Sequence, residues 1–234
     1  MDNFIKDYFE QIGYSLDDNQ ITNFNKYNDL LIQWNKVMNL TGITEYKEVV
    51  IKHFADSIMP LLHHNFDNKS VIDVGTGAGF PGLPLKIANN SIKLTLLDSL
   101  NKRLNFLKEV CSSCDINCQL IHGRAEEVSR NKLHRERYDI AISRAVAPIN
   151  ILSEYLLPFV KPGGKMIALK GPNVYEELKN GERAIKNLGG KLTLVKEITL
   201  PETELNHTLV FIEKIYNTPN KYPRQNNKIE RNPL

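Results

Sequence analysis

Hydrophobic side chains recur at helical spacing through the first 62 residues. The tetrapeptide Ser15-Leu16-Asp17-Asp18 resembles a capping box with Asp18 in place of the usual glutamate, so a helix is expected to begin there. Its apolar positions follow helical steps and form one face: Ile21, Phe24, Leu31, Trp34 and Met38. A second amphipathic segment is predicted over residues 45–62. Because each segment has a single apolar face, both are expected to pack on the rest of the chain.

From residue 71 onward, short apolar runs alternate with helical periodicity. The short runs predict strands at residues 71–74, 93–98, 118–122, 138–143, 165–169, 192–195 and 207–212. Helices are expected over residues 100–111, 149–160 and 174–188, and a turn is expected at residues 161–164. Such alternation is typical of a doubly wound, mostly parallel sheet. Only a short loop at residues 201–204 separates the last two strands, so they are predicted to be antiparallel.

These patterns predict an α/β fold with a Rossmann-like sheet, mostly parallel with an antiparallel C-terminal strand, plus a helical N-terminal extension. We expect the extension to cover residues 1–65, the α/β domain residues 66–216 and a basic tail residues 217–234. The stretch from Lys214 onward has five basic residues against one acid, Glu230. Because the tail is rich in proline, asparagine and charge, we expect it to be mobile.

Composition and charge are ordinary for a globular protein. The chain is 41% hydrophobic and 24% charged, and its net charge of +3 is too small to indicate a nucleic-acid partner alone. No apolar run approaches the roughly 20 residues that cross a bilayer, and the N-terminus does not resemble a signal peptide. We therefore predict a cytoplasmic monomer without membrane association.

The chain has three cysteines, Cys111, Cys114 and Cys118. An odd count in a chain without an export signal argues against a disulfide framework. Their spacing lacks a fourth metal ligand, and His63-His64 has no partner at ligand spacing. We therefore expect the cysteines to be packing residues and predict no bound metal.

A run of glycines follows the first predicted strand, in Asp73-Val74-Gly75-Thr76-Gly77-Ala78-Gly79-Phe80-Pro81-Gly82. Glycines allow a sharp turn and let a ligand approach the backbone closely. Amides at the start of the following helix can then face a polar or anionic group. Since ligands of open α/β sheets bind at the carboxyl ends of the strands, this turn is the expected ligand site.

Two cofactor classes fit this turn. Gly77 to Gly82 satisfy a literal GxGxxG, and Asp98 lies near the spacing of about 20 residues expected of a ribose-binding acid in a nicotinamide site. S-adenosylmethionine is favoured because Asp73 can meet a charged amine, Gly75 widens the loop, and the sheet is expected to end with an antiparallel strand. Asp98 would then accept hydrogen bonds from the ribose hydroxyls. A strand-end acid that caps backbone amides is the alternative interpretation of Asp73.

Four segments together resemble one family: Met38-Asn39-Leu40-Thr41-Gly42-Ile43, His53-Phe54-Ala55-Asp56-Ser57, residues 73–82, and Ser143-Arg144-Ala145-Val146-Ala147. The chain is identified as a member of the bacterial ribosomal small-subunit methyltransferase G family, formerly called glucose-inhibited division protein B. The resemblance extends through nearly the whole chain. It implies an S-adenosylmethionine-dependent enzyme that forms 7-methylguanosine at one site in 16S rRNA. The implied partner is 16S rRNA or the small ribosomal subunit.

The resemblance also assigns residues to the cofactor and the RNA. The cofactor contacts that it implies are Gly75, Phe80, Asp98, Ser99, Leu100, Ala125, Glu126 and Arg144. The glycine turn adds Asp73, Gly77 and Gly79 to this set. His53 and Asn39 become candidate RNA contacts through the resemblance alone.

Cations at strand ends and in the tail are further candidates for RNA contact. Arg144 and Lys170 follow the fourth and fifth predicted strands, so both should reach the edge that carries the glycine turn. They could hold a phosphate or orient the base, although Arg144 could equally pair with Glu126 or another acid. In the tail, Lys221 and Arg224 could follow phosphates, with a merely solvated tail as the competing interpretation.

The target atom needs little from the enzyme. Guanine N7 has a lone pair and no proton to remove, so methyl transfer to it requires positioning and no general base. The sequence lacks the Pro-Pro-Tyr motif of exocyclic-amine methylation and the Pro-Cys pair of a covalent mechanism. We therefore expect no obligatory catalytic residue, with Arg144, Lys170 and His53 as positioning candidates. A non-catalytic RNA-binding assembly factor and an NAD-dependent oxidoreductase are the alternatives.

Overall fold

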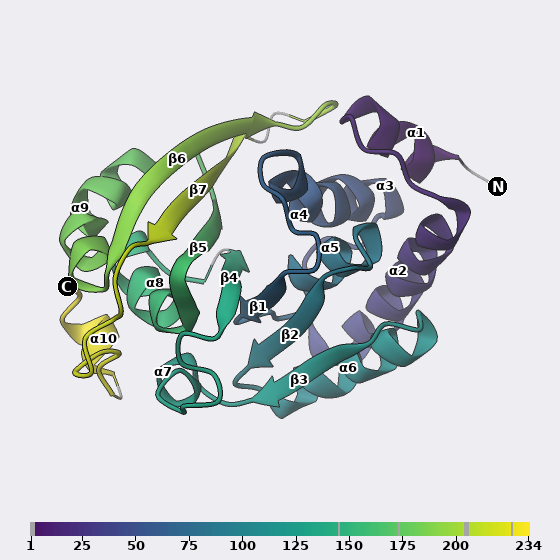
Figure 1. Ribbon diagram of the computed structural model, residues 1–234. Helices are drawn as coiled ribbons and strands as arrows, with labels where there is room; N and C mark the ends of the chain where they lie inside the picture. Colours follow the sequence, from purple (N-terminus) through teal and green to yellow (C-terminus); the bar gives the residue numbers. More distant parts are fainter. Residues whose placement is uncertain (1–2, 145, 173, 204–205, 226) are drawn as a thin grey trace.

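A seven-stranded sheet runs through the middle of the molecule in the order β3-β2-β1-β4-β5-β7-β6 (Figure 1). The computed structural model describes residues 3–144, 146–172, 174–203, 206–225 and 227–234. The strands are β1 (Ser70–Val74), β2 (Lys93–Asp98), β3 (Cys118–His122), β4 (Tyr138–Arg144), β5 (Val160–Lys170), β6 (Gly190–Thr199) and β7 (Asn206–Lys214).

The strand directions confirm the predicted fold class. Strands β1 to β5 pair in parallel, whereas β7 lies between β5 and β6 and is antiparallel to both. In the register of β4, β5 and β7, Arg144 lies opposite Leu169, and Lys170 lies opposite Thr208. The carboxyl ends of the parallel strands and the start of β7 therefore meet at one edge of the sheet.

Helices cover both faces of the sheet (Figure 1). They are α1 (Phe4–Gln11), α2 (Asp18–Met38), α3 (Tyr46–Val49), the π-helical η1 (Val50–Ala55), α4 (Asp56–Ile58), the 3₁₀ turn η2 (Met59–Leu62), α5 (Gly82–Ala88), α6 (Asn101–Ser113), α7 (Ala125–Val128), α8 (Ile149–Leu156), the 3₁₀ turn η3 (Leu157–Phe159), α9 (Val174–Asn187) and α10 (Lys228–Arg231). Successive strand residues point to opposite faces. In β5, Ile167 and Leu169 join the core beneath α1 to α6, while Met166 and Ala168 join the core beneath α8 and α9.

The N-terminal helices share a core with the sheet, as their single apolar faces predicted. Rings from α2 and η1 pack together, with Phe24 and Phe54 at 5.0 Å between centroids. Tyr27 of α2 is fully buried, and its ring lies 5.5 Å from that of Phe80 in the glycine turn. Its hydroxyl donates a hydrogen bond to the carbonyl oxygen of Ala78. The N-terminal helices therefore support the turn directly.

The structure differs from two local predictions, the start of α2 and the turn at residues 161–164. The N-cap of α2 is Asp17, whose side chain accepts from the amide of Gln20 in a reciprocal capping box, so the helix begins two residues later than the Ser15 start predicted. Residues 161–164, predicted as a turn, lie within β5, where the register against β4 shifts. This irregularity lets β5 start at Val160 directly after η3.

The expectation of a mobile tail is wrong for its described residues. Ile229 and Tyr222 are buried, and Arg224 forms an ion pair with Glu154 of α8. Two further arginines anchor the backbone, Arg130 by donating to the carbonyl of Pro223 and Arg135 by donating to that of Tyr222. Proline-rich composition suggested mobility, but these side chains from distant parts of the chain bind the tail to the sheet domain.

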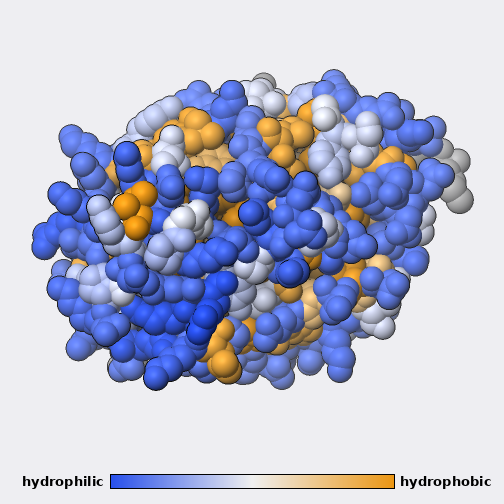
Figure 2. All heavy atoms as spheres, viewed as in Figure 1, coloured by the Kyte–Doolittle hydropathy of each residue, from blue (hydrophilic) through white to orange (hydrophobic). Residues whose placement is uncertain are grey.

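Hydrophilic side chains dominate the face shown in Figure 2, where hydrophobic atoms occur in small separate groups. Val37 and Leu133 are among the exposed apolar residues of the chain, and single exposed residues of this kind are ordinary for a globular protein. Within the described ranges of the chain, no helix is both long and apolar enough to cross a membrane.

Candidate active site

Asp73 organises the glycine turn from below. It is fully buried, and its Oδ2 accepts hydrogen bonds from the Thr76 hydroxyl at 2.6 Å and from the Gly82 amide at 2.9 Å. Its Oδ1 has no partner among the described residues. Burial raises the pKa of Asp73 to about 6, although the two hydrogen bonds partly oppose that rise. Asp73 thus caps the Gly82 amide and the Thr76 hydroxyl, and it does not line the cavity above the turn.

Two glycines are required by close packing around the turn. A Cβ on Gly82 would lie 2.8 Å from Asp73 Oδ2 and 2.6 Å from a methyl carbon of Leu96. Gly79 has a φ of +97°, and a Cβ there would lie 2.6 Å from the Tyr27 hydroxyl. Gly79 therefore contacts the N-terminal helices rather than the cavity, whereas Gly75 and Gly77 line the cavity.

Asp98, at the carboxyl end of β2, faces the turn with only 2% of its surface exposed. Its Oδ2 accepts from the Gly77 amide at 2.9 Å, and its Oδ1 accepts from the Leu100 amide at 2.9 Å. Arg103 of α6 adds a long contact of 3.4 Å to Oδ2. Leu100 thus shapes the site through its backbone, and its side chain is outside the cavity. The geometry fixes the carboxylate while leaving room for a polar ligand.

Three cavities adjoin at this edge of the sheet. Most of the glycine turn borders a cavity of about 520 Å³. Thr41, Phe80, Ser99 and Arg103 also line this cavity. A smaller cavity of about 180 Å³ lies on the other side of Asp98, beside Leu97, Ala125, Glu126 and Tyr155. A third cavity of about 560 Å³ is lined by residues of η1, α4, β4, β5 and β7. Its polar lining residues are Lys52, His53, Asp56, Arg144, Lys170 and His207. His53 and Arg144 line both the first and the third cavity.

Arg144 occupies the junction between these two cavities. Its Nη1 donates to Asp56 Oδ2 at 2.9 Å and to the Lys52 carbonyl at 3.1 Å. Its Nη2 lies 3.2 Å from His53 Nδ1, and its guanidinium carbon lies 4.8 Å from the centre of the Phe80 ring. The acid that pairs with Arg144 is thus Asp56, not Glu126, whose ion pair is with Arg124 at 3.5 Å.

Asp56 joins the arginine to the far strand. It is 1% exposed, and its Oδ1 lies 2.5 Å from Nδ1 of His207 in β7. Burial alone would raise the pKa of Asp56, but the hydrogen bond from His207 and the charge of Arg144 lower it overall. The hydrogen bond to Asp56 correspondingly raises the pKa of His207. Burial and the charge of Arg144 lower the pKa of His53 to about 4, so this ring is neutral at pH 7.

Comparisons with known proteins show the family of this chain. Residues 20–206 match the family model described as "rRNA small subunit methyltransferase G". The chain belongs to this family. It is 50% identical to a protein of Alkaliphilus metalliredigens over 98% of this chain and 97% of that protein, and 51% identical to one of a Thermoanaerobacter species over 95% and 93%. Both relatives are named ribosomal RNA small subunit methyltransferase G.

Solved structures show the same fold at low sequence identity. An S-adenosylmethionine-dependent methyltransferase from Aquifex aeolicus superposes with a TM-score of 0.55 at 16% identity, covering 75% of this chain and 97% of that protein. TrmN from Thermus thermophilus superposes with a TM-score of 0.51 at 15% identity, covering 71% of this chain and 53% of that protein. The predicted family and fold class are both confirmed.

The residues predicted for RNA contact fall into separate places. Lys170 ends β5 and lines the third cavity, where its Nζ lies 2.8 Å from Glu177 and donates to the Ala147 carbonyl at 2.9 Å. Asn39 is exposed at the end of α2, with a φ of 49°. Lys221 lies over the Tyr222 ring in the tail. Each remains a candidate RNA contact.

The guanidinium of Arg224 is engaged by an acid of the fold. Its Nη2 lies 2.7 Å from Glu154 Oε2, and its Nε lies 3.0 Å from Glu154 Oε1. Glu154 is fully buried, so the arginine neutralises a carboxylate inside the fold. Arg224 therefore anchors the tail, and its contact with RNA stays a prediction.

Sequence reasoning missed Thr41, Asp56, Arg103 and His207 as site residues. Thr41 and Asp56 lay inside quoted family segments, which was a signal that their side chains have a role. Asp56 and His207 are 151 positions apart, so nothing local in the sequence connects them. Only the pairing of β7 with β5 brings His207 to the carboxyl edge.

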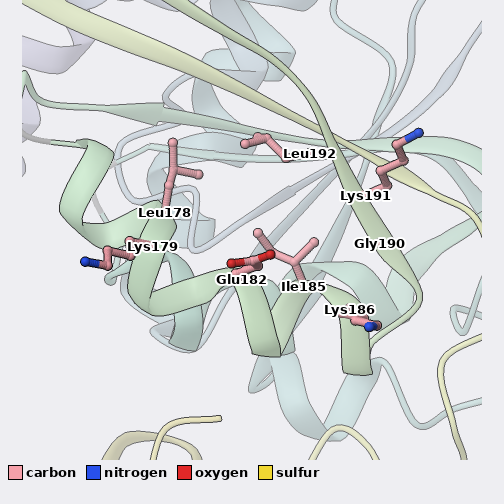
Figure 3. A pocket seen from close by; sticks show the side chains of 8 residues that line it. All are labelled: Leu178, Lys179, Glu182, Ile185, Lys186, Gly190, Lys191 and Leu192. Atoms are coloured by element: carbon pink, nitrogen blue, oxygen red, sulfur yellow. The ribbon is translucent and has the colours of Figure 1, made fainter.

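A groove lies between α9 and β6 (Figure 3). Its volume is about 570 Å³, and Leu178, Ile185 and Leu192 point into it beside charged side chains of α9. Its β6 residue Lys191 pairs with Glu213, which lies opposite Lys165 toward the amino end of β5. The groove is thus at the opposite end of the sheet from Arg144 and Lys170.

The cysteines pack in the core, as predicted for residues of this kind. Cys111 and Cys114 are buried, Cys118 is half-buried, and all three are free thiols. Among the residues that the structure describes, no group of three His, Cys, Asp or Glu side chains converges in a way that could hold a metal ion.

The His207–Asp56 pair should make stability depend on pH. The folded-state pKa of His207 is raised above its ordinary value of about 6.5, so the pair stabilises the fold fully below that pH and loses its effect as pH rises through the raised pKa. We expect His207→Gln to lower Tm most in mildly acidic buffer, with the difference from wild type shrinking in alkaline buffer. Thermal denaturation of both proteins across a pH series measures this, and a difference that stays constant with pH would contradict it.

Proposed function

We propose that this chain transfers the methyl group of S-adenosylmethionine to N7 of one guanine in 16S rRNA. The observation that carries the proposal is the pair of cavities that share His53 and Arg144 as a common wall. A methyl donor and an acceptor base must approach one another in line from two sides. Membership of the family supplies the reaction class, and the two cavities supply the positions for both reactants.

The cavities around Asp98 suit the donor. The carboxylate has about four acceptor sites, of which the Gly77 amide, the Leu100 amide and Arg103 use three. The Arg103 contact is long at 3.4 Å, so that side chain, which is 41% exposed, can turn away for a ribose diol. Asp98 lines both the 520 Å³ and the 180 Å³ cavity, so a ribose held there directs the two ends of the cofactor into different cavities.

The two ends can be assigned from the cavity walls. Leu97 and Ala125 give the smaller cavity apolar contacts that suit adenine. Arg103 and Arg144 line the larger cavity, where they favour the carboxylate of the methionyl portion. Phe80, whose ring lies against the Arg144 guanidinium, would supply an apolar wall for the cofactor in this cavity. When bound, S-adenosylmethionine supplies an electrophilic methyl group.

The third cavity suits the RNA base. It opens beside Lys52, Arg144 and Lys170, and the Asp56 carboxylate beneath it is already neutralised by Arg144 and His207. Cations at the cavity rim attract the phosphates that flank a target nucleotide. Arg144 and Lys170 therefore orient the RNA, and His53 stays neutral between the two reactants.

Methylation of guanine N7 requires no proton transfer before the methyl group is transferred. Guanine N7 presents a lone pair without a proton, so a general base has nothing to remove. The buried acid nearest the junction, Asp56, is committed on both oxygens to Arg144 and His207. These side chains act by holding the reactants in line, so catalysis is positioning.

The test is methyl transfer from labelled S-adenosylmethionine to small subunits that lack the modification, followed by borohydride and aniline treatment, which cleaves RNA at 7-methylguanosine. We expect label uptake with one new cleavage site, and no uptake with an Asp98→Ala variant. Uptake without cleavage would overturn the N7 assignment. Salt-dependent RNA binding without uptake on bare RNA, precursor particles and mature subunits would favour an assembly factor.

We also propose that the chain acts in the cytoplasm as a monomer on the small ribosomal subunit. Sedimentation of the active protein at assay concentration tests the monomer.

A further inference from the structure

The side chains of Arg144, His53 and Thr41 form a hydrogen-bonded row along the 520 Å³ cavity. Arg144 Nη2 lies 3.2 Å from Nδ1 of His53, and His53 Nε2 lies 2.7 Å from the Thr41 hydroxyl oxygen. The same hydroxyl oxygen accepts a hydrogen bond from the Ile43 amide at 3.0 Å. Thr41, His53 and Arg144 all line the 520 Å³ cavity.

The arginine determines the tautomer of the histidine. A guanidinium can only donate hydrogen bonds, so Nδ1 of a neutral His53 must accept from Arg144. The ring proton is then on Nε2, which donates to Thr41. The Lys52 carbonyl, 3.2 Å from Nδ1, is satisfied by Arg144 Nη1 at 3.1 Å and does not need the histidine proton.

This tautomer leaves Thr41 with one unused donor. A hydroxyl has two acceptor positions and one proton. The Nε2 proton of His53 and the Ile43 amide fill both acceptor positions. No described residue accepts the Thr41 proton, and the cavity is the space that this side chain lines. The row therefore presents an O–H donor to whatever occupies the cavity.

Because the Thr41 hydroxyl can only donate its free proton, it selects a hydrogen-bond acceptor on the cofactor. Of the groups on the methionyl portion, the ammonium can only donate, whereas the carboxylate can only accept. The ribose hydroxyls are assigned to Asp98 on the other wall. We propose that Thr41 binds the carboxylate of S-adenosylmethionine through its hydroxyl proton, with His53 and Arg144 fixing the direction of that proton. This inference rests on the proposed function, because it assumes that the cavity holds that cofactor.

Binding measurements on the purified protein without RNA test the proposal. Calorimetry compares Thr41→Val, which keeps the shape and removes the hydroxyl, with Thr41→Ser, which keeps the hydroxyl. The ligands are S-adenosylmethionine, S-adenosylhomocysteine, which retains the carboxylate, and 5′-methylthioadenosine, which lacks the amino-acid portion. A hydrogen bond to a charged group leads us to expect about a tenfold loss of affinity in Thr41→Val for the first two ligands. Thr41→Ser should bind all three like wild type, and 5′-methylthioadenosine should not distinguish the variants.

Each outcome separates the proposal from its premise. Equal losses for all three ligands in Thr41→Val, or no loss for any of them, would overturn the carboxylate contact. A wild-type protein that binds none of the three would instead overturn the proposed function. The tautomer is tested independently by long-range ¹⁵N–¹H spectra of the histidine rings. We expect the His53 proton on Nε2, and a proton on Nδ1 would overturn the row.

Discussion

Replacing Asp56 with alanine is expected to lower kcat for methyl transfer about 100-fold, because misplacement by about 1 Å of a positioning group can cost that much. Asp56 is 1% exposed and is the acid that holds the Arg144 guanidinium, at 2.9 Å. Without Asp56, Arg144 loses the ion pair that keeps its guanidinium between the 520 Å³ cavity and the 560 Å³ cavity. His207 loses its partner in the same substitution, so β7 is no longer bound to α4 at this point. Single-turnover methylation of small subunits measures the effect.

A partly buried carboxylate elsewhere in the sheet, Asp139, provides the control, since it too is a paired acid. Asp139 accepts hydrogen bonds from Ser70 at the amino edge of the sheet and pairs with Lys161 at 2.8 Å. Asp139→Ala also removes a paired acid, so it should destabilise the fold without changing kcat at a temperature where both variants are folded. Equal kcat losses in both variants would assign Asp56 to stability alone. An unchanged kcat in Asp56→Ala would remove Arg144 from the positioning role.

How much of the site the sequence could predict depended on distance along the chain. The glycine turn and Asp98 were predicted because a strand, a turn and the next strand-end acid are local patterns, and the structure brings them together at 2.9 Å between Gly77 and Asp98. Arg144 was placed at the correct edge because parallel strands align their carboxyl ends. Its partner was not predictable, since Asp56 is on an N-terminal helix 88 positions away.

The position of the tail likewise could not be predicted from local sequence patterns. Its composition of proline, asparagine and charge indicates mobility when considered alone, because few apolar residues are available to bury. Arg130, Arg135 and Glu154 lie in segments whose patterns describe only their own helices and loops. The partners of the tail are thus set by tertiary packing, which a local pattern cannot report.

Glu154→Ala is expected to lower the free energy of unfolding by about 3 kcal/mol, because it removes the charged hydrogen bonds that hold Arg224 of the tail against α8. Glu154 is fully buried in α8 and accepts three bonds from the Arg224 guanidinium and one from its backbone amide, the last at 2.6 Å. Urea denaturation measures the loss, and Glu127→Ala, an exposed acid of α7, should change stability by no more than about 0.5 kcal/mol. Because Arg224 is 21% exposed and can be solvated when alone, Arg224→Ala should be the more harmful change, since it strands the carboxylate in the core. If Glu154→Ala proved as mild as Glu127→Ala, the tail would be held by its arginine–carbonyl bonds and buried Ile229 instead.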